Sequence, residues 1–198
     1  MSKILTIYEA LLNRREKICH KSNIVEILKE YNKSIGKINS DNAIKYLSRH
    51  KYIKRIILNY YYINSLDEKE RNFCKYEDRE LLFIVLNKLK IKWYFGLNSA
   101  LYLLGKTWQT PNTITIINNK ISGRRTVLGL RVRFIKIKES LIFGLGGGKT
   151  KNNIPYAYSN LAKTYLDLAY LRETDKLVSE KETRNYLKKY PKWLSKLI

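Results

Sequence analysis

The spacing of apolar residues changes near His50, and this change constrains the fold more than any other feature of the sequence. Before it, apolar side chains recur every three or four residues, as on one face of an amphipathic helix. In the last helical segment, Ala43, Ile44 and Leu47 are expected to face the core. The pattern predicts helices over residues 2–15, from Ser22 onward and from Ser40 onward, with a turn at residues 34–37.

After His50 the pattern is that of a β-hairpin. Residues 52–57 and 60–63 are rich in β-branched and aromatic side chains, and Leu58-Asn59 separates them as a short turn. Three helices followed by a hairpin are the order of a winged helix-turn-helix. Residues 1–64 are therefore predicted to form such a domain, and the polar residues 65–75 to connect it to the remainder.

Residues 76–198 are predicted to form a second domain, of mixed α+β class with an antiparallel sheet. A short helix should begin with Asn98 as its N-cap and end at Gly105. The other helices are expected over residues 77–90, 159–172 and 183–190, and strands over residues 113–117, 127–137 and 141–143.

The glycines at 146–148, followed by Lys149 and Thr150, suggest a phosphate-binding loop. That loop also needs a glycine four residues before its Gly-Lys-Thr, and Phe143 occupies the position. We therefore reject the phosphate-loop interpretation and expect a flexible basic loop here.

Charge indicates the class of partner. The chain has 39 Lys and Arg against 17 Asp and Glu, a net charge of +22. Residues 1–64 hold 13 basic and 5 acidic side chains, and residues 76–198 hold 23 and 9. An excess of this size favours polyanions, because binding releases their counterions. An acidic protein partner, a membrane surface or AT-rich codon usage would account for the same excess.

The predicted third helix and hairpin carry side chains suited to double-stranded DNA. Asn and Arg make paired hydrogen bonds with adenine and guanine edges, whereas Lys, Ser and the helix N-terminus suit phosphates. A solvated helix face, or a surface that binds protein, is the alternative. The expected DNA contacts are Asn39, Ser40, Asn42, Lys45, Tyr46 and Arg49 of the helix, and Lys54, Arg55, Asn59 and Tyr60 of the hairpin.

Other function classes find little support in the sequence. Two histidines without a Ser/His/Asp or paired-acid spacing predict no enzyme and no cofactor. Cys19 and Cys74 are too far apart in the sequence for a zinc motif, so no metal site is expected. No apolar run approaches the ~20 residues that span a bilayer, which predicts a cytoplasmic protein without membrane contact.

Three segments together resemble the AbiEi family of antitoxins, the regulatory components of type IV toxin–antitoxin systems, also described as regulators of viral defence. They are the hairpin of residues 50–63, the Ser-Ala-Leu helix of residues 94–105 and the late Lys-Thr-x-x-Asp-Leu helix of residues 160–168. Two departures stand out: Leu58-Asn59 replaces the glycine usual at the hairpin turn, and Lys106 follows the second segment.

The resemblance implies a two-part role. The winged helix would bind promoter inverted repeats, as an oligomer if the repeats require one, and repress its own operon. The second domain would counteract a nucleotidyltransferase-like toxin without obligatory stable binding. Lys163, Thr164 and Asp167 are the positions carried over for the antitoxin function, although a capping or core role for them is equally open.

Two further functions stay open at the level of sequence. The chain could be a stand-alone transcription regulator whose second domain senses a ligand or dimerises. It could also be an RNA-binding protein, since Arg124, Arg125, Arg131, Arg133, Lys136 and Lys138 form a second cationic surface.

Overall fold

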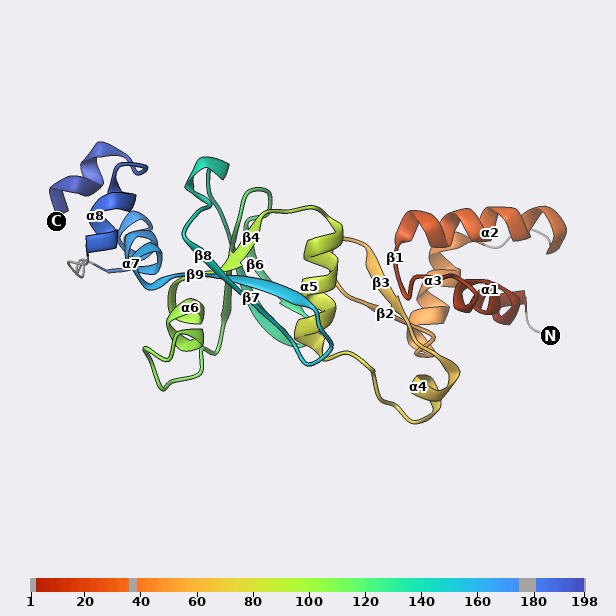
Figure 1. Cartoon of the computed structure of the whole chain (residues 1–198). Coiled ribbons are helices and arrows are strands. Elements are labelled where there is room, and N and C mark those ends of the chain that lie inside the picture. Colours follow the sequence, from red (N-terminus) through yellow and green to blue (C-terminus); the bar gives the residue numbers. More distant parts are fainter. Residues whose placement is uncertain (1–2, 36–38, 175–180, 198) are drawn as a thin grey trace. The chain divides into compact units, whose positions relative to one another are not determined.

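The chain is a mixed α+β protein that divides into two compact units, Met1–Val85 and Leu86–Ile198 (Figure 1). The structure is a computed structural model that describes residues 3–35, 39–174 and 181–197. Each unit has its own buried core and its own sheet.

Unit 1 combines a small antiparallel sheet with the helices α1 to α4. The sheet has strand order β1-β3-β2, so the strand nearest the start of the chain lies beside the second strand of the hairpin. The elements of the unit are α1 (Lys3–Leu12), β1 (Ile18–His20), α2 (Lys21–Ile35), α3 (Ser40–Arg49), β2 (Ile53–Arg55), β3 (Tyr60–Ile63) and α4 (Leu66–Glu70). The sequence pattern did not predict β1. The predicted turn at residues 34–37 is wrong for Ser34 and Ile35, which end α2, and residues 36–37 lie outside the described residues.

The core of unit 1 forms where the helices meet one face of the sheet. The expected burial of Ala43, Ile44 and Leu47 is confirmed, and Tyr61 reaches the same core from β3. Burying an aliphatic side chain of the size of Ile44 or Leu47 stabilises the fold by about 1.5–3 kcal/mol. The Tyr8 hydroxyl donates to the main-chain oxygen of Asn64 at 2.7 Å, and burial raises the pKa of Tyr8 to about 12.

The predicted hairpin, with its turn at Leu58-Asn59, is confirmed. Both turn residues have positive φ, 50° and 62°, as the central residues of a type I′ turn do. The Tyr60 N–H donates to the Ile57 carbonyl at 2.9 Å and closes the turn. Asn tolerates this conformation, whereas for Leu58 it costs roughly 1–2 kcal/mol.

Residues 65–75, which we predicted to be a connection, contain α4 and belong to unit 1. Its anchor is Glu68, which is 6% exposed. The Glu68 carboxylate accepts hydrogen bonds from the Tyr62 hydroxyl at 2.6 Å, the Ser65 N–H at 2.7 Å and the Lys75 N–H at 2.9 Å. A buried carboxylate needs such hydrogen-bond donors, and these bonds hold residues 65–75 against β3. Unit 1 extends beyond this segment to Val85.

Unit 2 is built on a six-stranded sheet with strand order β6-β7-β5-β4-β9-β8. The antiparallel sheet that we predicted is wrong in one respect: the sheet is mixed, because β4 pairs with β9 in parallel and β5 with β7 in parallel. The elements from the end of unit 1 are α5 (Asp78–Lys88), β4 (Trp93–Phe95), α6 (Leu97–Leu103), β5 (Ile114–Asn118), β6 (Gly123–Val127), β7 (Leu130–Lys136), η1 (Glu139–Leu141), β8 (Leu145–Lys149), β9 (Pro155–Ser159), α7 (Leu161–Tyr170), α8 (Lys181–Leu187) and η2 (Lys192–Leu197).

The glycine run at residues 146–148 lies in strand β8, so the predicted flexible loop is wrong. The run pairs with β9, where Gly146 lies opposite Tyr158 and Gly148 opposite Tyr156. A Cβ added to Gly148 would come within 2.6 Å of the Tyr156 ring, and one on Gly146 within 2.9 Å of the Tyr158 ring. Glycine is therefore used here to let two tyrosine rings lie across the strand.

Two local predictions in unit 2 also need correction. Residues 141–143 do not form a strand: Leu141 ends the short helix η1, and its buried side chain joins the core beside α7. The N-cap of α6 is Gly96 rather than Asn98. A side chain at this position would clash, because a Cβ on Gly96 would come within 2.3 Å of the Ile117 side chain. Gly105 adopts a φ of 66° immediately after α6, in agreement with the predicted end of this helix.

Candidate nucleic-acid interface and buried polar network

Helix α3 begins at a well-formed cap. The Asn39 side-chain oxygen accepts the main-chain N–H groups of Asp41 at 3.0 Å and Asn42 at 3.1 Å. Asp41 also forms an ion pair with Lys21 at 2.8 Å, which ties the start of α2 to α3 and holds the Asp41 pKa below its usual value. This cap uses the side-chain oxygen of Asn39. The expected DNA contact of Asn39 would therefore be made by its side-chain amide nitrogen.

One face of α3 is solvent-exposed and polar along its whole length. Asn42, Lys45, Tyr46 and Arg49 are exposed, at the i, i+3, i+4, i+7 spacing that places them on one side of a helix. The Tyr46 ring packs against the His50 ring with centroids 4.1 Å apart. Ser40 is half-buried at the first turn. The structure thus brings the four exposed residues together on one surface, whereas Ser40 lies on the same side of the helix as the buried Ala43 and Leu47.

The hairpin residues divide into two groups. Arg55 and Asn59 are exposed, as a contact with nucleic acid would require. Lys54 instead forms an ion pair with Asp78 at 2.7 Å. Tyr60 is half-buried, with its ring 5.2 Å from the His20 ring. Of the four predicted hairpin contacts, Arg55 and Asn59 are the most accessible.

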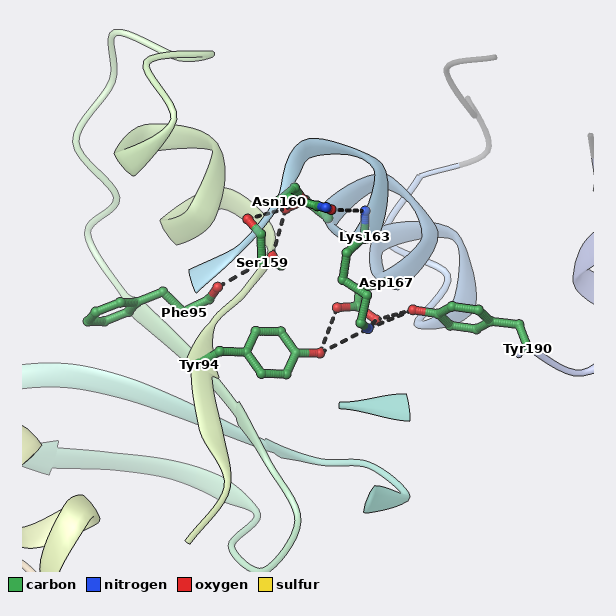
Figure 2. A network of polar contacts seen from close by, with 8 residues as sticks. Tyr94, Phe95, Ser159, Asn160, Lys163, Asp167 and Tyr190 are labelled. Atoms are coloured by element: carbon green, nitrogen blue, oxygen red, sulfur yellow. Dashed lines mark hydrogen bonds and ion pairs between the residues drawn. The ribbon is translucent and has the colours of Figure 1, made fainter. Parts of the chain in front are cut away.

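The three positions carried over for the antitoxin function lie in a buried network on α7 (Figure 2). Lys163 and Asp167 are 0% and 1% exposed and form an ion pair one helical turn apart. The Lys163 ammonium also donates to the hydroxyls of Tyr94 at 3.0 Å and Tyr190 at 2.6 Å. Both hydroxyls donate to the Asp167 carboxylate at 2.7 Å. Every charged atom of the pair is thereby given a partner.

Burial controls the protonation of this network. Removal from water lowers the pKa of Lys163, although the Asp167 carboxylate opposes the change. Burial, and then the charge of Asp167, raise the pKa values of Tyr94 and Tyr190, so both hydroxyls keep their protons and act as donors. The tyrosines come from β4 and from the turn after α8, so the network fastens α7 to both.

Thr164 belongs to the start of the same helix. Its hydroxyl donates to the Asn160 carbonyl at 2.8 Å and lies 2.7 Å from the Ser159 hydroxyl. The Asn160 side chain caps α7 by accepting the Lys163 N–H at 2.9 Å. All three carried-over side chains are buried, so none can touch a partner while α7 stays packed. The sequence did not single out Tyr94 or Tyr190, although a Lys and an Asp on the buried face of one helix require such partners.

Comparison with known proteins identifies no relative: no protein-family model matches the chain, and a search of curated proteins finds no match. Within residues 3–35, 39–174 and 181–197, no three His, Cys, Asp or Glu side chains are grouped closely enough to hold a metal ion. None of the helices described there is long and apolar enough to cross a membrane.

Proposed function

We propose that unit 1 is a winged helix-turn-helix that binds double-stranded DNA, with α3 in the major groove and the β2–β3 hairpin on the adjoining backbone. The order of its helices and strands supports this proposal, since β1, β3 and β2 form a small sheet behind the helices. The major groove is wide enough to admit one α-helix. The net positive charge of residues 1–64 favours the same partner.

The observation that carries the proposal is the exposed face of α3. Asn42 and Arg49 are the side chain types that make paired hydrogen bonds with adenine and guanine. They lie two helical turns apart, with Lys45 between them, and the opposite face is buried. The helix is therefore held rigidly from behind while its polar groups stay free for base edges and phosphates.

We further propose that the protein is an antitoxin that represses its own operon, as the resemblance to the AbiEi family implies. It would bind inverted repeats in its promoter and counteract a nucleotidyltransferase-like toxin without an enzymatic step of its own. Because Lys163, Thr164 and Asp167 are buried, they would serve neutralisation by holding α7 in place. Contact with the toxin, if direct, would then involve exposed residues of unit 2.

Operator binding by variants of the full chain tests the DNA-binding proposal. Asn42→Ala and Arg49→Ala should each weaken binding to promoter DNA by about 1–3 kcal/mol and binding to random duplex far less. Arg55→Ala, which removes a backbone contact, should weaken both duplexes equally. Lys29→Ala is the control for charge, because Lys29 is exposed on α2. Equal losses on both duplexes for all four variants would contradict base reading by α3.

Growth of cells that produce the toxin tests the antitoxin proposal. The toxin is the nucleotidyltransferase-like protein that this proposal expects to be encoded next to the chain's own gene, and the chain is expressed from an independent promoter. The double variant Asn42→Ala/Arg49→Ala should lose repression but still protect the cells, because the proposal assigns repression to unit 1 and neutralisation to unit 2. Loss of protection together with DNA binding, at unchanged protein level, would refute the division between the units.

A further inference from the structure

Unit 2 contains an open hollow of about 880 Å³ that the roles proposed above do not use. Its lining residues come from α6, from the loop that follows α6, from β5 and from the β6–β7 hairpin. None of the residues that line it is acidic. Four arginines line it, Arg124, Arg125, Arg131 and Arg133, and Asn98 and Gln109 add amide groups.

The sheet register gathers three of these arginines on one face. Arg124 pairs with Arg133 across β6 and β7, and Arg131 lies opposite Thr126. Side chains two residues apart on a strand share a face, as do directly opposed partners, so Arg124, Arg131 and Arg133 extend from the same side. Like charges placed opposite one another destabilise a strand pair unless an anion lies between them.

The protein itself neutralises only part of this charge. Arg133 forms an ion pair with Glu173 at 2.7 Å. Within the described ranges, Arg124, Arg125 and Arg131 form no ion pair, and all three are exposed. The hollow thus presents guanidinium groups in the positions and the number that suit several phosphates along a chain.

An exposed tryptophan lies in the chain between two residues that line the hollow, although Trp108 does not itself line it. Trp108 is 94% exposed, and its neighbours Thr107 and Gln109 both line the hollow. An indole ring left almost wholly in water contributes nothing to the core, whereas it offers a flat surface on which a nucleobase can stack. Stacking of this kind needs a base that is not paired within a duplex.

We propose that this hollow binds single-stranded nucleic acid, with the arginines on the phosphates, Trp108 stacked on a base and the amide groups at base edges. A protein with an acidic surface would explain the arginines but not the exposed indole and its amide neighbours. A duplex would meet the arginines but could not stack on Trp108. The inference rests on unit 2 alone and is independent of the DNA-binding role proposed for unit 1.

Binding of fluorescently labelled 12-mers of deoxythymidine and of uridine to the full chain tests the proposal. All variants carry Asn42→Ala/Arg49→Ala, so that the proposed duplex site does not contribute. Arg124→Ala/Arg131→Ala should weaken binding of either strand at least about tenfold and flatten the dependence of log affinity on log salt by about 1.4, the value for two phosphates on a single strand. Lys149→Ala/Lys188→Ala removes two exposed charges elsewhere in unit 2 and should weaken binding less than twofold.

Variants of Trp108 test base stacking separately from the effect of charge. Trp108→Ala should weaken binding about tenfold without changing the salt dependence, and Trp108→Phe should restore part of the loss. With Trp193 replaced by Phe, the remaining exposed indole is Trp108, since Trp93 is buried. Its fluorescence should fall when a strand binds. The side chain is almost wholly exposed, so its replacement leaves the fold intact, which circular dichroism checks.

Each contrary result has a definite meaning. Equal losses for the arginine and lysine double variants would show a diffuse charge effect and overturn the site. Normal binding by Trp108→Ala, together with displacement of the strand by polyglutamate, would identify an acidic-protein surface instead. Displacement by a duplex at the same phosphate concentration would assign the hollow to double-stranded DNA. A preference between the two 12-mers would distinguish DNA from RNA and leave the proposal standing.

Discussion

The side chain of Lys163, with its ammonium group, is fully buried. Its pairing with Asp167, and the hydroxyls of Tyr94 and Tyr190, give each charge and each hydroxyl a hydrogen-bonding partner. Such a pair contributes little net stability compared with apolar side chains of similar volume, yet loss of one member leaves an uncompensated buried charge. The arrangement therefore makes the packing of α7 depend on all four side chains together.

Lys163→Ala or Asp167→Ala should each lower the free energy of unfolding by about 3–5 kcal/mol, because the remaining charge is left buried and unpaired. The double variant Lys163→Ala/Asp167→Ala should lose less than the sum of the two single changes. Urea unfolding followed by tryptophan fluorescence measures this in unit 2 specifically, since Trp93, Trp108 and Trp193 all lie there. Strictly additive losses would show that the pair is not coupled.

At the scale of elements, the short helix α4 owes its position to one carboxylate. Burial pushes the pKa of Glu68 upward, but hydrogen bonds from the Ser65 N–H, the Tyr62 hydroxyl and the Lys75 N–H outweigh it, so the net pKa is lowered. A carboxyl whose folded pKa is depressed adds stability above its unfolded pKa, and this stability is lost as the pH falls through the folded value.

Thermal melts between pH 7 and pH 3 test the role of Glu68. The full chain should lose stability below about pH 4.5, the ordinary pKa of a Glu, as Glu68 takes up a proton. Glu68→Gln should cost about 1–3 kcal/mol at pH 7, because a charged acceptor is lost from buried donors. Its melting temperature should also fall less steeply with acid. If Glu68→Gln has the same melting temperature as the parent protein at every pH from 7 to 3, this carboxylate is not the anchor of α4.

Helices and strands were predicted correctly where the pattern of apolar residues extends over many positions. The prediction failed where contacts between strands determine the structure. The helical spacing of Ala43, Ile44 and Leu47, and the β-forming residues on either side of Leu58-Asn59, were sufficient for α3 and the hairpin. Strands β1 and β4 have three residues each, too few for a period to show. The glycines of β8 indicated a loop because glycine has a low strand propensity, and the tyrosine rings that they accommodate lie on the next strand, β9.

For the whole molecule, net charge and class of fold could be predicted, but strand neighbours could not. Periodicity describes each strand alone and contains no signal that β7, rather than β6, lies beside β5. The surface of α3 was predicted residue by residue, because a helix fixes which side chains share a face. The hollow around Arg124 and Trp108 depends on segments that meet only in the folded unit, so the sequence showed its charge but not its shape.

Reading of base edges in duplex DNA by α3 is tested most directly by one measurement. Each operator guanine is replaced in turn by 7-deazaguanine, which lacks the N7 acceptor in the major groove, and affinity is measured for the parent chain and for Arg49→Ala. We predict one position per half-site where the parent loses about tenfold and Arg49→Ala loses nothing further, because the same hydrogen bond is already gone. Additive losses at every guanine would contradict base reading by this helix.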